Sequence, residues 1–346
     1  MFKKFLIATL IGFIPTVVFT GCDKEENEVV VPNAPDDDSD DGDNKPDKPD
    51  DGTNVNKEKS VIIHADGTTS DGSHFRPIDA TTFMLNYIKY QIREGHIEVI
   101  GHDNTEIKLT LNGEVDLYSK IEFNNISYNV RKIAAEAFND CTSLKVINIP
   151  NSVSEIGNCA FSGCTSLIKI NLPNSISKIS GGTFSSCSSL AEICLPNSII
   201  EIDEYAFYGC QSLSHVDIPE GVIEIDDAFT DCPKLISISL PSTIKYFNNE
   251  QHHVENTFDL KYIYCKSNIP PLYTNENGLY TNENDDHYGN KKFKYIGQIK
   301  TFVPNNALSN YKSSSWAALA RYAEIIGVDT KTFDLQEYLK KQGVYE

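Results

Sequence analysis

Nine cysteines are the most reactive side chains in this sequence, and five of them recur at a fixed spacing. The recurring five are Cys141, Cys164, Cys187, Cys210 and Cys232. No C-x-x-C pair occurs, which disfavours a zinc or redox site. A small apolar side chain that returns once per repeat is typical of a buried core position. We therefore predict that these five cysteines pack in a core without forming disulfides. The pairing of Cys159, Cys194 and Cys265 stays open.

The sequence contains few other motifs that could support catalysis or metal binding. The sequence contains no H-E-x-x-H, no G-x-S-x-G and no phosphate-binding G-x-x-x-x-G-K motif. His252 and His253 with Glu255 could ligate a metal, but this spacing alone is a weak signal. We therefore predict no catalytic residues, no metal and no cofactor, and hence a protein that is not an enzyme.

Three further columns share the register of the cysteines, with spacings of 23, 23, 23 and 22 residues. The aromatic column is Phe138, Phe161, Phe184, Phe207 and Phe229. The aliphatic column is Leu144, Leu167, Leu190, Leu213 and Leu235. The third column is Pro150, Pro173, Pro196, Pro219 and Pro241. A fixed period of this length predicts stacked supersecondary units, that is, a solenoid.

One repeat unit can be read from its apolar spacing. Ile147 and Ile149 alternate with polar positions, which predicts a short strand with one face inward. Pro150 follows at the strand end, where its missing N–H does least harm to the ladder. No unit can bury its apolar residues alone, so stacking must do it.

The amino-terminal 58 residues read as an export signal and a tether. Lys3 and Lys4 precede an apolar run, and the ending Phe-Thr-Gly before Cys22 resembles a bacterial lipoprotein signal over residues 1–21. That resemblance implies that Cys22 carries acyl chains. Residues 23–58 hold 14 acidic residues and four lysines, which predicts a disordered acidic spacer over 22–58.

Charge excludes one class of partner. The whole chain carries a net charge of −19, and residues 59–346 still carry −11. Nucleic-acid binding needs a basic stripe, which is missing here. The acidic body would also be repelled by anionic lipid, so the membrane link is expected through the anchor.

The unit pattern L-x-x-I-x-L-P-x-S-I-x-x-I-x-x-x-x-F-x-x-C resembles BspA-like leucine-rich repeat proteins of bacterial surfaces. The resemblance covers roughly residues 83–327, including a degenerate last unit at 260–271 and the segment 301–304 with Tyr311 and Trp316. It implies a mostly β fold, a leucine-rich-repeat solenoid of about five 23-residue rungs. It also implies adhesion or matrix-protein binding, without a portable binding motif.

The repeats divide the remaining chain into three parts. Residues 59–130 alternate in apolar character and predict a β-rich N-terminal cap, with a hairpin turn at Arg93-Glu94-Gly95. The solenoid is expected over 131–271. Residues 272–346 are expected to form a C-terminal cap with a loop insertion and a helical tail, and 306–326 to form a helix over the end of the stack.

Binding residues should be sought where the surface departs from the repeat. The strand face offers two outward positions per rung, and the carboxyl-terminal rungs place His215 and Asp217 beside Tyr262 and Tyr264. Exposed aromatics next to hydrogen-bonding side chains suit protein or sugar contacts. A tandem duplication over 272–284 adds Tyr273 and Tyr280 as further candidates.

These features predict a non-enzymatic binding or adhesion protein, lipid-anchored in the outer membrane, exposed at the cell surface and monomeric. Its expected partner is a host matrix protein or a protein on another cell. The alternative is a glycan-binding accessory lipoprotein of a nutrient-capture system. A third hypothesis is a hydrolase whose site lies in the cap insertions.

Overall fold

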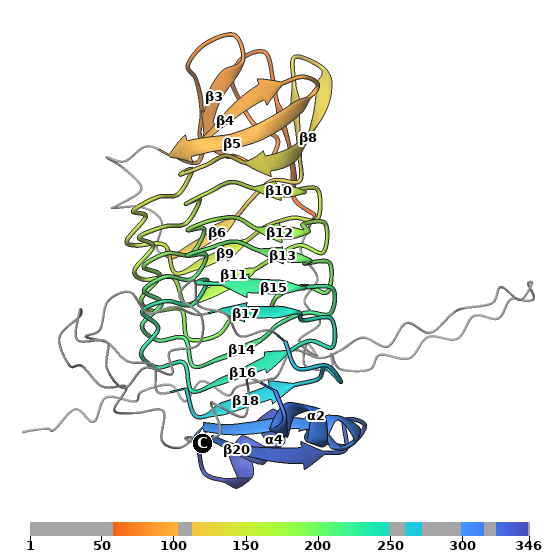
Figure 1. Cartoon of the computed structure of the whole chain (residues 1–346). Helices are drawn as coiled ribbons and strands as arrows, with labels where there is room; N and C mark the ends of the chain where they lie inside the picture. Colours follow the sequence, from red (N-terminus) through yellow and green to blue (C-terminus); the bar gives the residue numbers. More distant parts are fainter. Residues whose placement is uncertain (1–57, 103–112, 249–259, 272–298, 315–322, 345–346) are drawn as a thin grey trace, which may run out of the picture. The chain divides into compact units, whose positions relative to one another are not determined.

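The computed structural model describes residues 58–102, 113–248, 260–271, 299–314 and 323–344. The described chain is built mainly from short β-strands, which confirms the predicted mostly β solenoid. Figure 1 shows the repeat units stacked one on another between the β-rich N-terminal segment and the segment that holds β20 and α4. Within the described residues, no helix is long and apolar enough to cross a membrane.

The segment before the repeats is a sheet in the order β1-β7-β8-β5-β4-β3-β2. Its strands are β1 (Ser60–Ile63), β2 (Phe75–Pro77), β3 (Thr82–Leu85), β4 (Ile88–Arg93), β5 (His96–His102), β7 (Lys120–Phe123) and β8 (Ile126–Ile133). β4 and β5 pair antiparallel with Arg93 opposite His96, so the predicted hairpin is confirmed. β8 also pairs in parallel with β10 (Glu155–Ile156) of the repeats, which covers the end of the stack.

Successive rungs, apart from the third, contribute strands to a row that we call the primary row, and strands before and after the repeats extend it. Its members are β6 (Glu114–Asp116), β9 (Val146–Asn148), β11 (Lys169–Asn171), β14 (His215–Asp217), β16 (Ser237–Leu240), β18 (Tyr262–Cys265), β19 (Ile299–Pro304) and β20 (Ala323–Val328). They form two parallel sheets, ordered β11-β9-β6 and β14-β16-β18-β19-β20. Residues 191–195 of the third rung lie between these sheets without strand pairing.

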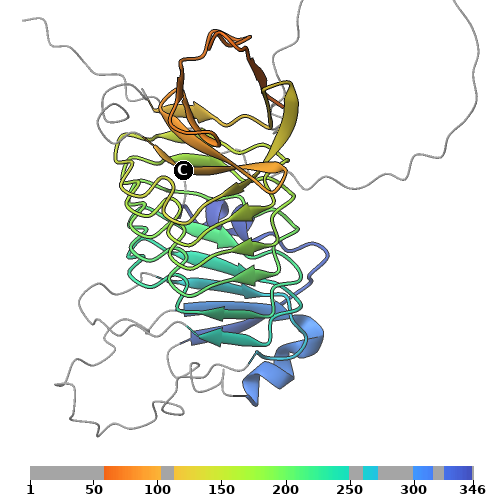
Figure 2. The ribbon, with the colours of Figure 1, turned by 90° about the horizontal axis from the view of Figure 1, so that it is seen from above.

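A secondary row of shorter strands follows the proline of each rung. It consists of β10 (Glu155–Ile156), β12 (Lys178–Ile179), β13 (Glu201–Ile202), β15 (Glu224–Asp226) and β17 (Tyr246–Asn248). β12 pairs with β13 and β15 with β17, in parallel. Figure 2 shows the strands of successive rungs running in a common direction.

The repeating phenylalanines form one continuous stack in the core. Neighbouring ring centroids from Phe138 to Phe229 lie 5.3, 5.8, 5.4 and 5.1 Å apart, with interplanar angles of 19° or less. All five rings are at most 1% exposed. Each ring therefore buries its faces against its neighbours, and the stack links every rung to the next.

The repeating cysteines are buried and free, which confirms the predicted packing role. Each of the last four lies 3.1–3.2 Å, through Sγ, from the carbonyl oxygen of the phenylalanine in the preceding rung. The thiol is thus a small apolar side chain that also donates a weak hydrogen bond. Burial raises the pKa of Cys187 to about 12, so this thiol stays protonated at neutral pH.

Two backbone positions in every rung lie in the left-handed region, two residues before and two residues after the phenylalanine. Their φ angles run from 44° to 71° at Glu136, Cys159, Gly182, Tyr205 and Asp227, and at Asp140, Gly163, Ser186, Gly209 and Asp231. Seven of these ten residues are not glycine, so the turn carries a backbone cost of about 1–2 kcal/mol at each. Hydrogen bonds between turns of neighbouring rungs, such as Phe184 N–H to the Ala206 carbonyl at 2.8 Å, hold this geometry.

The segment after the repeats extends the primary row. β19 pairs with β18, and β20 pairs with β19, both in parallel. Short helical turns η2 (Asn305–Ala307) and α2 (Leu308–Lys312) follow β19, and α4 (Leu335–Lys341) follows β20. The expected helix over 306–326 is therefore corrected: residues 323–326 belong to a strand, because the backbone of β19 offers a ladder that β20 completes.

We predict that Phe184→Ala lowers the free energy of unfolding by about 3–5 kcal/mol, since it opens a cavity in the middle of the aromatic stack. Chemical denaturation of the full chain measures this change. Tyr246→Ala is the matched control, because Tyr246 is 40% exposed and its loss should cost less than about 1 kcal/mol. Similar losses in both variants would contradict the role of the stack.

Candidate functional site

The outward side chains of the first primary sheet bond to one another. Asn171 donates through Nδ2 to Asn148 Oδ1, and Asn148 donates through Nδ2 to Asp116 Oδ1. This ladder arises because parallel pairing places the same outward position of successive rungs in register. The asparagine amides of this ladder form hydrogen bonds within the protein. This part of the face therefore stabilises the sheet rather than binding a partner.

The second primary sheet and the neighbouring third rung carry a different outward arrangement, which we call the His215 cluster: Glu192 of the third rung with His215, Asp217, Ser237 and Ser239 of the sheet. The register of β14 and β16 sets His215 beside Ser237 and Asp217 beside Ser239. His215 Nδ1 lies 2.7 Å from Ser237 Oγ, and His215 Nε2 lies 3.2 Å from Asp217 Oδ1. The structure thus brings together the two predicted residues His215 and Asp217.

Electrostatics differ at the two acids of the His215 cluster. Burial raises the pKa of Asp217, but the contact with His215, a hydrogen bond from Ser239 and the charge of Lys266 outweigh it and hold the pKa at about 2. Burial raises the pKa of Glu192, and the charge of His215 opposes that shift. The cluster therefore presents one firmly ionised carboxylate, Asp217, whose side chain is 63% exposed.

A serine, a histidine and an aspartate in contact invite comparison with a nucleophilic triad, but the arrangement here does not support one. Ser237 has no exposed surface, so a substrate carbon cannot reach its oxygen. The ring is also reversed relative to a triad, since Nδ1 contacts the serine and Nε2 the aspartate. In the described part of the chain, no group of three or more His, Cys, Asp or Glu residues could hold a metal.

Tyr264 is buried and Tyr262 is half-buried, which corrects the expectation that both face solvent. Tyr264 is 5% exposed and meets Phe333 edge-on at 5.0 Å, and Tyr262 meets Tyr338 at 6.3 Å. Tyr264 belongs to a second apolar cluster formed with Phe302 of β19 and with Leu335 and Leu339 of α4, and Tyr262 packs against this cluster. The carboxyl-terminal segment packs on the outward face of β18 and β19, because the aromatic side chains of this face would otherwise be exposed to water.

The other predicted site residues, Cys22, Tyr273 and Tyr280, lie outside the described residues, as do His252, His253 and Glu255. Lipidation at Cys22 and binding by the duplicated segment therefore stay predictions.

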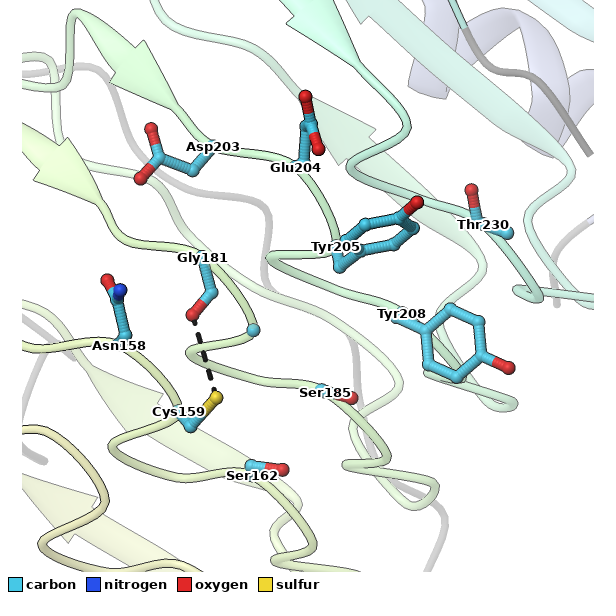
Figure 3. A pocket seen from close by; sticks show the side chains of 11 residues that line it. Asn158, Cys159, Ser162, Gly181, Ser185, Asp203, Glu204, Tyr205, Tyr208 and Thr230 are labelled. Atoms are coloured by element: carbon cyan, nitrogen blue, oxygen red, sulfur yellow. Dashed lines mark hydrogen bonds between the residues drawn. The ribbon is translucent and has the colours of Figure 1, made fainter.

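The turns that precede and follow the phenylalanines form a hollow. The repeat pattern did not predict it. We call it the Tyr205 hollow; it has a volume of about 820 Å³ and spans four successive rungs. Its principal lining residues are Asn158, Cys159, Gly181, Glu204, Tyr205 and Tyr208 (Figure 3). Gly182 also lines it. The third rung contributes Gly181 and Gly182 to the lining where its two neighbours carry larger side chains, and this difference accounts for the hollow.

The backbone of the rung turns positions this lining. Gly182 and Tyr205 occupy the same left-handed position of consecutive rungs, with φ angles of 64° and 59°. A Cβ atom at Gly182 would lie 2.9 Å from Cys159 Sγ, so only glycine lets the backbone approach this sulfur without a clash. Aligning the units on their phenylalanines places Gly181-Gly182 against Glu204-Tyr205, and this comparison could have revealed the hollow from sequence.

We predict that His215→Asn raises the pKa of Asp217 from about 2 toward the ordinary value of about 3.9, because the contacts from the imidazole ring are lost. Titration of the carboxyl carbon by NMR measures this pKa. An Asp pKa lowered by folding stabilises the folded state above about pH 4, and this contribution disappears as the pH falls toward 2. An unchanged midpoint in the variant would contradict the contact.

Comparison with known proteins gives one clear family match. The sequence matches the BspA type leucine rich repeat region in six copies, over residues 117–227 and 166–284. No curated protein matches the chain significantly.

Several solved bacterial structures resemble the chain. A leucine-rich repeat protein of T. pallidum is 25% identical, over 73% of this chain and 100% of its own, with a TM-score of 0.47. A leucine-rich repeat protein of Bacteroides ovatus is 23% identical, over 71% and 67%, with a TM-score of 0.43. A leucine rich cell surface protein of Faecalibacterium prausnitzii is 20% identical, over 67% and 72%, with a TM-score of 0.45.

The repeat match agrees with the stacked rungs, the phenylalanine stack and the buried cysteines described above. By sequence, residues 117–284 are a BspA type leucine rich repeat region.

Proposed function

We propose that this protein is a non-enzymatic, lipid-anchored protein of the cell surface that binds a macromolecular partner, a host matrix protein or a protein on another cell. The observation that carries this proposal is the His215 cluster, a polar set on the outward face of the second primary sheet. Proteins with BspA-type repeats are typically surface-located binding scaffolds without catalytic activity.

The chemistry of the His215 cluster suits a protein partner. Asp217 presents an exposed carboxylate that its neighbours keep ionised, and His215 is held in place by Ser237 at 2.7 Å. A preorganised charged group loses little side-chain entropy when a partner binds. Together with the charge of −11 over residues 59–346, this favours a partner whose contact surface is basic.

The proposed anchoring follows from the amino-terminal sequence. Acyl chains on Cys22 would hold the protein at the membrane, and the acidic stretch 23–58 would set the repeats away from it. A binding face displayed in this way reaches partners beyond the cell envelope.

We predict that the full chain binds at least one of immobilised fibronectin, fibrinogen, laminin and collagen. His215→Ala combined with Asp217→Ala should weaken that binding at least about tenfold, because a charged hydrogen-bonding group is lost from the contact. Surface plasmon resonance measures the dissociation constants.

The matched control for the double variant is His96→Ala with Glu98→Ala. These residues are also two apart on one strand, β5, with His96 Nε2 3.4 Å from Glu98 Oε1. The control should change the affinity less than about twofold. Equal losses in both double variants, or no binding to any of the four proteins, would contradict the proposal.

We also predict that protease added to intact cells removes the protein, since surface display leaves the acidic spacer accessible. Immunoblotting of the cells before and after treatment measures the loss. Full protection in intact cells, with cleavage after the outer membrane is permeabilised, would place the protein on the periplasmic side.

A further inference from the structure

We infer that the Tyr205 hollow is a second binding site, which takes a neutral saccharide. The hollow lies on the phenylalanine turns of the rungs, whereas the His215 cluster lies on the primary row, so the two sites share no residue. Its volume of about 820 Å³ falls within the range of about 300–1,000 Å³ that is usual for small-molecule sites.

Four polar side chains around the hollow have no partner within the described part of the protein. Among the described residues, the side chains of Asn158, Ser162, Ser185 and Glu204 make no hydrogen bond or ion pair, although all four line the hollow. They supply an amide, two hydroxyls and a carboxylate, which together can donate and accept. Sugar hydroxyls both donate and accept, so this set matches a polyhydroxylated ligand.

One wall of the hollow is aromatic. Tyr205 is 44% exposed and meets Tyr208 edge-on, with ring centroids 6.1 Å apart and an interplanar angle of 80°. The face of an aromatic ring carries negative charge density and attracts the C–H groups of a pyranose. Backbone hydrogen bonds from Tyr205 N–H to the Asp227 carbonyl at 3.2 Å and from Tyr208 N–H to the Tyr205 carbonyl at 3.0 Å hold the two residues.

Charge decides which saccharides fit. Asp203 at the rim is paired with Lys178, whose Nζ lies 2.9 Å from Asp203 Oδ1, so Glu204 is the one lining carboxylate without an ion pair among the described residues. A single exposed carboxylate repels sialylated or sulfated sugars. This carboxylate would also bind a basic side chain only weakly, since an exposed ion pair contributes about 0–1 kcal/mol to the binding free energy. A neutral sugar needs only the hydrogen bonds that Glu204 can accept.

The test is isothermal titration calorimetry of the full chain with neutral trisaccharides of glucose, galactose and mannose, with sialyllactose and with an arginine amide. We expect at least one neutral trisaccharide to bind, and neither charged probe to bind more tightly. Tyr205→Ala and Tyr208→Ala should each weaken that binding about tenfold, because each removes part of the aromatic wall. Tyr208→Ala is the second variant because Tyr205 has a left-handed backbone that alanine tolerates poorly.

Tyr246→Ala is the matched control, since Tyr246 is 40% exposed on β17 of the secondary row; it should leave the affinity within about twofold. Glu204→Gln keeps a side-chain oxygen that accepts hydrogen bonds, so it should weaken sugar binding less than about fivefold. The same substitution removes the negative charge and would abolish binding of a cation. The inference is overturned if no neutral trisaccharide binds, if only the arginine amide binds, or if Tyr205→Ala and Tyr208→Ala act no differently from Tyr246→Ala. Binding to matrix proteins is unaffected by these results.

Discussion

Stacking between neighbouring rungs is the interaction on which every other feature of this protein depends. One rung has an apolar inner face and no element of its own to cover it. The phenylalanine stack, with spacings of 5.1–5.8 Å, and the hydrogen bonds between successive turns supply that cover. The cysteine column serves the same purpose, because a thiol fits the narrow space and bonds to a carbonyl of the preceding rung.

Because of this constraint, only residues that do not take part in stacking are available to bind a partner. Columns that face the core must stay apolar and in register, so variation is confined to the outward strand positions and to the turns. The His215 cluster uses the first of these, and the Tyr205 hollow uses the second. Both sites combine residues from neighbouring rungs, so the stack positions them as it stabilises the fold.

Periodicity made the repeat region predictable, because each column residue has the same surroundings in every rung. Phe184 and Cys187 could be assigned to the core from their columns alone. The expectations for residues 323–326 and for the exposure of Tyr264 were wrong for a common reason. β20 is a strand because β19 lies beside it, and Tyr264 is buried because Phe333 packs on it. Neither neighbour is set by the local pattern.

The sequence by itself therefore determined the repeat and its buried columns, since these follow from spacing and side-chain type. Only the tertiary structure decided which outward residues remain accessible. Burial of Tyr264 depends on a segment about 70 residues later in the chain, and the hollow over Gly182 depends on side chains 23 residues away on either side. The exposure of a side chain depends on which distant segments of the chain pack against it. The local sequence pattern does not specify those segments.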